Sequence, residues 1–164
     1  MSLLNDLALK MMEYYKNDPK RISHFMKVHS YAKLIGEEEH LDKELLFITE
    51  AAAYIHDIGI KNALAKYNSS IGMLQEKEGP DEARKMLTEL GFEEEQIERI
   101  CYIVGNHHTY SKIDNIDFQI VIEANLIANY YEDNLPLDNI LYSYDQVFKT
   151  ETGKRIMENI YNLA

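Results

Sequence analysis

The stretch Ala51-Ala52-Ala53-Tyr54-Ile55-His56-Asp57-Ile58-Gly59 decides how this chain folds. It closes a segment from about Asp42 to His56 that is apolar almost all round, and such a helix belongs in the middle of a fold. Gly59 is expected to end that helix. A carboxylate at the end of a buried helix is costly unless it is paired or binds a cation, so His56 and Asp57 are candidates for chemistry. The alternative is that His56 and Asp57 form a helix cap or an ion pair. If the His-Asp dipeptide stood alone, this structural interpretation would be preferred.

Outward from this stretch the chain is predicted to be all-α, with no alternating strand pattern of useful length. Residues 61–79 are predicted to be mainly loop with short helical turns, because they contain Asn, Ser and Gly clusters. Residues 120–122 have strand-like composition, but the length and later apolar spacing of their segment favour a buried helix. Helices are predicted over residues 3–15, 19–36, 42–56, 80–90, 93–106, 118–132 and 153–163.

Composition limits the kind of protein this is. The 164 residues fit one domain, and 17 Lys+Arg against 28 Asp+Glu give a formal charge of -11. That acidity argues against general nucleic-acid binding, which needs excess Lys and Arg. One Cys permits no internal disulfide, and no run reaches the roughly 20 apolar residues of a membrane span. With no visible signal peptide, we expect a soluble cytoplasmic domain.

Other histidines occur in apolar-periodic segments. His24 shares a helix face with Val28, Tyr31 and Ile35, so it is expected to point inward. His107 and His108 come at the end of a predicted helix, where the backbone leaves helical geometry and both imidazoles can reach one site. A hydrogen-bonded helix end is the alternative for that pair, and it would be preferred if the pair stood alone.

The combination of these segments resembles the HD-domain superfamily of metal-dependent phosphohydrolases, and is closest to small stand-alone bacterial members. The matching motifs are R-I-S-H-x-x-x-V-x-x-x-A at residues 21–32, A-A-A-x-I-H-D-I-G at 51–59, I-x-x-I-V-x-N-H-H-T at 100–109 and I-V-I-E-A-N at 120–125. The resemblance implies a single-domain helical HD bundle, with a motif-bearing core of about residues 20–130 and a helical extension over 131–164.

Carried over position by position, the resemblance implies metal ligands at His24, His56, Asp57 and Asn125. Asn125 departs from the family's Asp, which removes one negative charge while leaving a carbonyl oxygen as a ligand. Gln75 stands where dinuclear members have an additional histidine. One divalent ion is therefore expected, with its identity open among Mn, Fe, Co, Ni, Zn and Mg.

The function that the resemblance implies is hydrolysis of a phosphate ester in a nucleotide or other small metabolite. Asp57 would orient the attacking water, and His107 or His108 would donate a proton or stabilise charge. Lys61 and Arg21 are candidate phosphate cations, with ordinary surface charges as their alternative.

Two other hypotheses remain open. One is a degenerate HD domain that binds a nucleotide or metabolite without turnover, which Asn125 and Gln75 motivate. The other is a helical scaffold whose histidines are structural, and it ranks last because buried polar groups need partners. No membrane partner is expected, and self-association through the tyrosines at 130–131 and 142–144 is a possible homo-oligomer contact.

Overall fold

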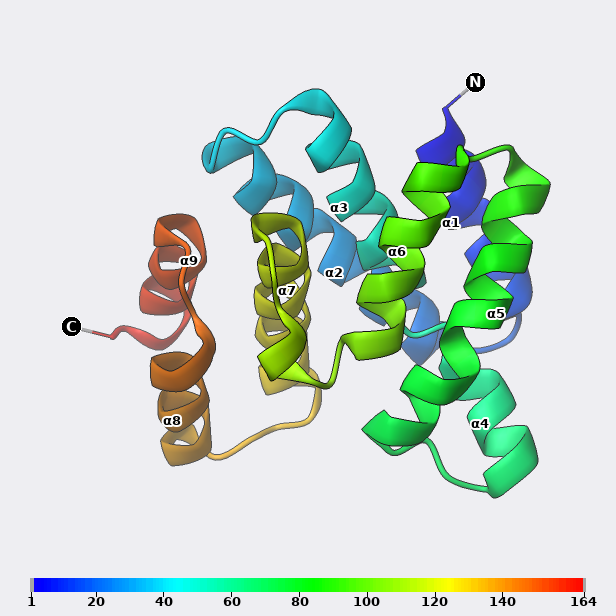
Figure 1. The fold of residues 1–164 in the computed structure, drawn as a ribbon. Helices are drawn as coiled ribbons and strands as arrows, with labels where there is room; N and C mark the ends of the chain where they lie inside the picture. Colours follow the sequence, from blue (N-terminus) through cyan, green and yellow to red (C-terminus); the bar gives the residue numbers. More distant parts are fainter. Residues whose placement is uncertain (1, 164) are drawn as a thin grey trace.

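The computed structural model describes residues 2–163, and within that range the chain is helical, with no β-strand (Figure 1). The prediction of an all-α bundle is confirmed. The elements are α1 (Leu3–Tyr14), α2 (Pro19–Glu38), α3 (Lys43–Ile55), α4 (Gly59–Tyr67), α5 (Gly72–Leu90), α6 (Glu94–Asn106), the short 3-10 helix η1 (Tyr110–Lys112), α7 (Ile116–Glu132), α8 (Leu137–Val147) and α9 (Glu151–Tyr161).

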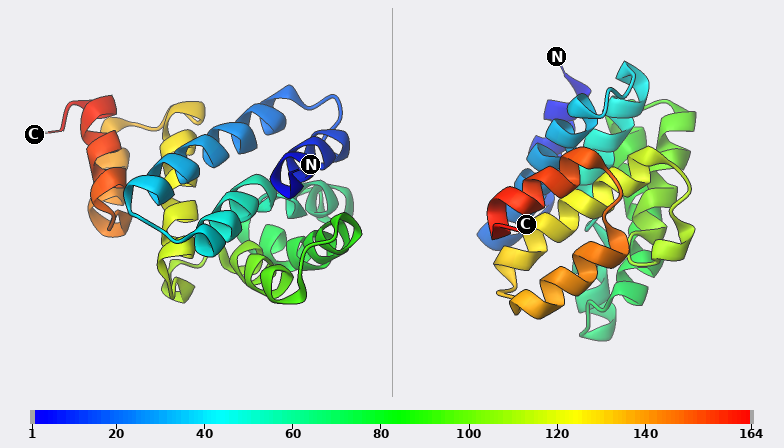
Figure 2. Two further views of the ribbon diagram at one scale, coloured as in Figure 1. Left: turned by 90° about the horizontal axis from the view of Figure 1, so that it is seen from above. Right: turned by 90° about the vertical axis from the view of Figure 1, so that its left-hand side faces the viewer.

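Helix α3 is the centre of the bundle. It packs against α1, α2, α6 and α7, and its residues from Ile48 onward are buried. One apolar core lies mainly among α1, α3, α5 and α6, and a second lies among α2, α7, α8 and α9. Helices α2 and α7 contribute to both cores, and Figure 2 shows the α8–α9 pair as an outer layer against them. Polar residues on α2, α3 and α7 therefore meet where the two cores join.

Local caps explain where the key helices begin. Asp18 accepts a hydrogen bond from the Arg21 backbone N–H, and Pro19 occupies the first turn of α2, where a missing N–H costs nothing. Asp42 caps α3 in the same way through the Leu45 N–H. These caps fix where α2 and α3 begin.

The prediction for residues 61–79 was wrong, because most of them are helical. Helix α4 begins at Gly59 directly after the turn that ends α3, and α5 begins at Gly72 and continues through Pro80. A proline inside a helix loses one hydrogen bond and crowds its neighbours. Gly105 of α6 faces the Pro80 ring and leaves room for it, which a sequence pattern cannot reveal.

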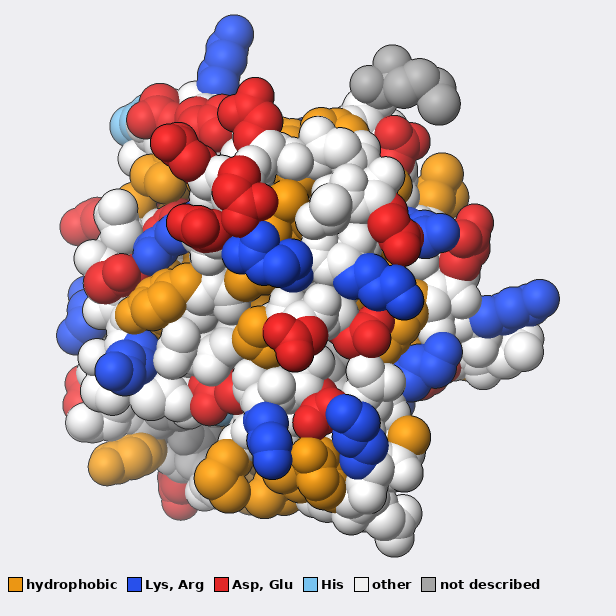
Figure 3. Space-filling view, turned by 45° about the vertical axis from the view of Figure 1, so that its right-hand side comes forward, with side chains coloured by type: hydrophobic (Ala, Val, Ile, Leu, Met, Phe, Trp, Pro, Cys, Tyr) orange, Lys and Arg blue, Asp and Glu red, His pale blue; other side chains and the backbone are white. Residues whose placement is uncertain are grey.

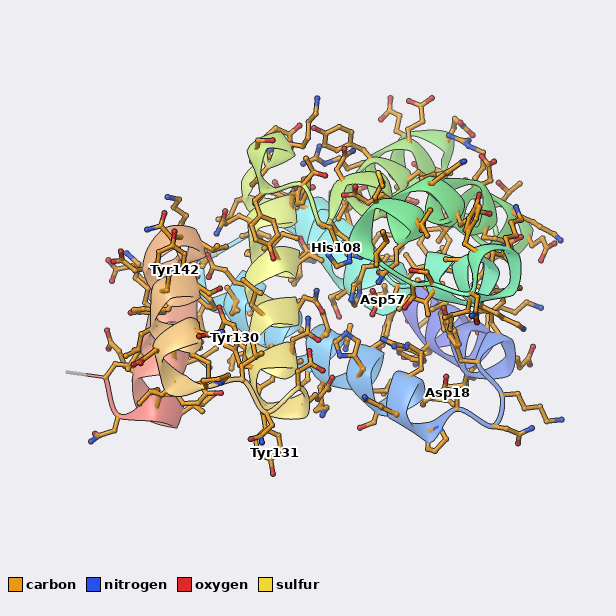
Figure 4. The ribbon with its side chains drawn as sticks, turned by 90° about the horizontal axis from the view of Figure 1, so that it is seen from below. Asp18, Asp57, His108, Tyr130, Tyr131 and Tyr142 are labelled. Carbon is orange, nitrogen blue, oxygen red and sulfur yellow. The ribbon has the colours of Figure 1, made fainter. Side chains whose placement is uncertain are left out.

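Within the expected helical extension, no separate helix was assigned at residues 137–147, although Pro136 precedes apolar residues at helical spacing: Leu137, Ile140, Leu141 and Tyr144. Of the tyrosines considered for self-association, Tyr130 is buried in the second core, whereas Tyr131 and Tyr142 are exposed and lie well apart in Figure 4.

Basic side chains lie singly or in pairs among acidic ones on the face seen in Figure 3, and no basic stripe crosses it. Within residues 2–163, no helix combines the length and apolar character needed to cross a membrane.

Candidate metal centre

Four side chains predicted to bind a metal meet at the join between the two cores. His24 comes from α2, His56 and Asp57 from the turn after α3, and Asn125 from the middle of α7. All four are buried, and Asp57 lies beside His108 among the surrounding helices (Figure 4). The His24 Nε2 atom is 3.2 Å from Asp57 Oδ2 and 3.4 Å from His56 Nε2. The His56 Nε2 atom is 3.3 Å from Asp57 Oδ2 and 3.2 Å from Asn125 Oδ1.

Backbone and carboxylate partners fix the tautomers of both histidines. The His56 Nδ1–H donates to the Ala53 carbonyl over 2.8 Å, and the His24 Nδ1–H donates to Glu132 Oε1 over 2.7 Å. Neither oxygen can donate, so in each neutral ring the proton lies on Nδ1 and the lone pair on Nε2. Both Nε2 lone pairs therefore face the Asp57 and Asn125 oxygens.

This arrangement fits a divalent cation. Two imidazole nitrogens, one carboxylate oxygen and one amide oxygen direct lone pairs at a common point, where they repel unless a proton or cation lies between them. Four-coordinate bonds of about 2.1 Å would separate ligand atoms by about 3.4 Å. The donor atoms of His24, His56 and Asp57 lie 3.2 to 3.4 Å from one another and form a group able to hold an ion, and Asn125 Oδ1 lies 3.2 Å from His56 Nε2.

Asp57 is the charge centre of the cluster. Burial raises the pKa of its carboxyl, but the neighbouring His56, His107 and His24 outweigh burial and hold that pKa well below its usual range. Burial also lowers the pKa of His56, so its neutral form is favoured. Burial opposes the charged form of His24 as well, yet Asp57 and Glu132 outweigh it and raise the pKa of that ring.

His107 and His108 lie on the other side of Asp57. The His107 Nδ1–H donates to the Val104 carbonyl over 2.7 Å, and its Nε2 is 3.4 Å from Asp57 Oδ1. The Gln75 Nε2 donates to the Ser70 carbonyl, which turns Gln75 Oε1 toward both rings, at 3.2 Å from His107 Nε2 and 3.0 Å from His108 Nε2. Burial, reinforced by His107, lowers the pKa of His108 to about 4, so His108 is neutral near pH 7.

A polar pocket of about 210 Å³ opens beside the cluster. Arg21 lines it and donates from Nη1 to Asp57 Oδ2 over 2.9 Å, while its Nε is buried with no hydrogen-bond partner among the described residues. An unpaired buried donor beside a candidate metal site is suited to an anionic oxygen. Lys20, which was not singled out from the sequence, lines the same pocket.

Lys61 is not brought to this cluster. Its ammonium group donates to the Tyr14 carbonyl over 3.1 Å and lies 4.6 Å from the centroid of the Tyr14 ring. It lines a separate groove with Tyr15 and Leu64.

The side chain that sequence reasoning missed is Glu132, which binds His24 and Lys27, each over 2.7 Å. Its position seven residues after Asn125, on the same helix face, was the available signal.

Comparisons with known proteins identify the fold and the family of this chain. Two solved structures of Bacillus subtilis YpgQ are similar in fold: the complex with ADP (TM-score 0.66, 18% identity, covering 98% of this chain and 88% of YpgQ) and the selenomethionine form (TM-score 0.62, 18% identity, covering 96% and 88%). A search of curated proteins gave no significant match. The HD domain family matches residues 21–147, a span that includes every residue of the cluster. This chain therefore belongs to the HD domain family.

Proposed function

We propose that this protein is a divalent-metal-dependent phosphohydrolase that acts on a nucleotide or another small phosphate ester. The observation that carries the proposal is the convergence of lone pairs from His24, His56, Asp57 and Asn125 beside a pocket that holds an unpaired buried Arg21 donor. Such a donor set suits Mn, Fe, Co, Ni or Zn, and Mg less well because of its imidazoles.

A divalent ion held by His24, His56, Asp57 and Asn125 would supply Lewis acidity and a nucleophile at neutral pH. The chain's own residues bind and orient the phosphate. Arg21 is placed to donate from Nε to a phosphate oxygen, and Lys20 adds a second positive charge against the overall charge of -11. His107, whose Nδ1–H is held by Val104, presents Nε2 toward Asp57 Oδ1, and His108, which lines the pocket, is the imidazole placed to reach a phosphate oxygen.

A nucleotide is the favoured substrate class. The structure of YpgQ was solved in complex with ADP, and this chain matches that fold over almost its whole length. The second candidate function is binding of a nucleotide or metabolite without turnover. It is supported by the two neutral amides, Asn125 and Gln75, at positions where a ligand charge or an imidazole would strengthen a metal site.

The deciding experiment measures metal content and phosphate release on protein purified without chelators. We expect one transition metal per chain by elemental analysis, and metal-dependent phosphate release from nucleoside phosphates or phenyl phosphate. His56→Ala should lose both, while His40→Asn, which removes an exposed imidazole outside the cluster, should lose neither. Metal binding and thermal stabilisation by ADP, without phosphate release with any metal, would favour the binding module. Absence of metal after incubation with Mn or Fe would contradict the proposed centre.

A further inference from the structure

The pocket beside the cluster continues beyond the candidate metal ligands, and its outer wall is polar. Lys20, Ser70, Asn129 and Asp133 come from three separate segments and all line it. None of the four side chains has a hydrogen-bond or ion-pair partner within residues 2–163, whereas Glu132, Gln75 and His108, which also line the pocket, each have one. The outer wall therefore offers free donors and acceptors.

Two of these side chains continue a stripe along α7 that starts at Asn125. Asn125, Asn129 and Asp133 are spaced four residues apart, which places them on one helix face. At 1.5 Å per residue the stripe extends about 12 Å from the candidate metal ligand to the end of the helix. A phosphate held beside Asn125 and Arg21 would thus place its leaving group against Asn129 and Asp133.

The composition of the wall limits what that leaving group is. Ile60 is the one apolar side chain among the residues that line the pocket, and it is itself buried. No Phe, Tyr or Trp lines the pocket, and its two imidazoles offer no free face: His24 is buried, and the His108 ring lies between Gly72 and the His107 ring, whose centroid is 4.2 Å away. A purine, pyrimidine or phenyl ring would therefore find no open face on which to stack. The aromatic groove beside Tyr14 and Leu64 shares only Ile60 with this pocket.

We infer that the outer pocket binds the hydroxyl-bearing part of the substrate, the ribose of a nucleotide or another sugar phosphate, and leaves the base outside. This inference rests on the proposed function. The Asp133 carboxylate and the Asn129 carbonyl accept hydrogen bonds from sugar hydroxyls, as acidic residues do for ribose in dinucleotide-binding folds. Asp133 repels phosphate oxygens, which keeps them on the Arg21 and Lys20 side of the pocket.

The test measures binding by calorimetry with Mn²⁺ present, so it does not depend on turnover. The probes are ADP, GDP, CDP and UDP, the 2′-deoxy and 2′,3′-dideoxy forms of ADP, ribose 5-phosphate and phenyl phosphate. We expect the four bases to differ by less than about threefold, and loss of both hydroxyls to weaken binding by about tenfold or more. Asp133→Ala and Asn129→Ala should each reduce that difference to about threefold. Asp145→Ala, which removes an exposed carboxylate on α8, should leave it unchanged.

Equal affinity for ADP and its dideoxy form would overturn the inference, as would a difference of more than tenfold between bases. Failure of ADP and ribose 5-phosphate to bind at all would also overturn it. Phosphate release from phenyl phosphate separates the two proposals. If release is metal-dependent and lost in His56→Ala while hydroxyls make no difference, the phosphohydrolase proposal stands and the sugar subsite does not.

Discussion

At the scale of single residues, the direction in which His24 presents its lone pair depends on Glu132. The carboxylate accepts from the His24 Nδ1–H and is itself held by Lys27. Burial raises the pKa of Glu132, but Lys27 and His24 outweigh it, so the pKa falls below its usual value and the carboxylate stays charged. A carboxylate behind a metal-binding imidazole fixes its tautomer and raises its basicity.

Replacing Glu132 tests this arrangement. Glu132→Leu removes the acceptor and should weaken metal binding by about 10- to 100-fold, whereas Glu132→Gln keeps an acceptor oxygen and should lose less. Nitrogen NMR of the metal-free protein should show His24 as the Nδ1–H tautomer in the wild type and lose that preference in Glu132→Leu. Lys33→Met, which removes an exposed lysine of the same helix α2, is the control. An unchanged tautomer and metal affinity in Glu132→Leu would contradict the role of Glu132.

A second residue-scale prediction concerns Asn125. Its amide oxygen lies 3.2 Å from His56 Nε2, so an Asp at the same position would bring a formal negative charge to the centre. We expect Asn125→Asp to tighten divalent metal binding by about tenfold or more, since ligand charge tunes affinity. Competition with a metal-binding dye measures this change. Unchanged affinity would mean that residue 125 does not ligate the ion.

The sequence predicted His24, His56, Asp57 and Asn125 because their spacing matches motifs, and the structure brings all four together. The sequence placed Lys61 near the site because it follows the H-D-I-G motif by one turn, but this spacing does not determine which face of α4 the side chain lies on. In the structure Lys61 lies against Tyr14. The sequence did not single out Glu132 because a carboxylate at a helix end in an acidic chain looks like an ordinary surface charge. Its contact with His24 becomes visible only when α2 and α7 are seen to pack together.

At the scale of elements, helices α4 and α5 cross where two glycines meet. A Cβ on Gly59 would lie 2.3 Å from the Gln75 carbonyl oxygen and 2.8 Å from the Gly79 nitrogen. Both obstacles are backbone, so relief requires the helices to separate. The sequence predicted that Gly59 ends a helix. In the structure Gly59 instead allows α4 and α5 to approach closely. That contact could not be foreseen, because the part of α5 that it faces was predicted to be loop.

Gly59→Ala should therefore destabilise the protein by about 1 to 3 kcal/mol or more, because overpacking against backbone forces a shift. The same shift moves Gln75 away from His107 and His108. Thermal denaturation measures the stability loss. The matched control is Gly36→Ala, where the obstacle is a leucine methyl that can rotate and the helix gains a better helix former. Equal stability of the two variants would show that the α4–α5 crossing tolerates a wider spacing.

At the scale of the whole molecule, the candidate centre lies at the join of two cores, and the second core is closed by a buried carboxylate that does not belong to the centre. Glu123 has no exposed surface and accepts hydrogen bonds from the backbone N–H groups of Lys149 and Thr150, the Thr150 hydroxyl and the Gln119 amide. A Cβ on Gly153 would overlap it. Glu123 thus ties the segment between α8 and α9 to α7, beside the contact of the Phe148 ring with Tyr130.

Glu123 is two residues from Asn125, yet we expect replacement of Glu123 to affect stability, whereas replacement of Asn125 affects metal binding. Glu123→Leu leaves several buried donors unpaired, at about 1 to 3 kcal/mol each, so the melting temperature should fall sharply. Glu123→Gln should lower the melting temperature by less than Glu123→Leu. It should still lower it, because the new amide nitrogen would face hydrogen-bond donors. Metal stoichiometry at a temperature below the transition should stay at the wild-type value in both folded variants, since Glu123 faces α9 and not the cluster. Loss of metal from folded Glu123→Gln would show instead that packing of α8 and α9 controls the geometry of α7 at Asn125.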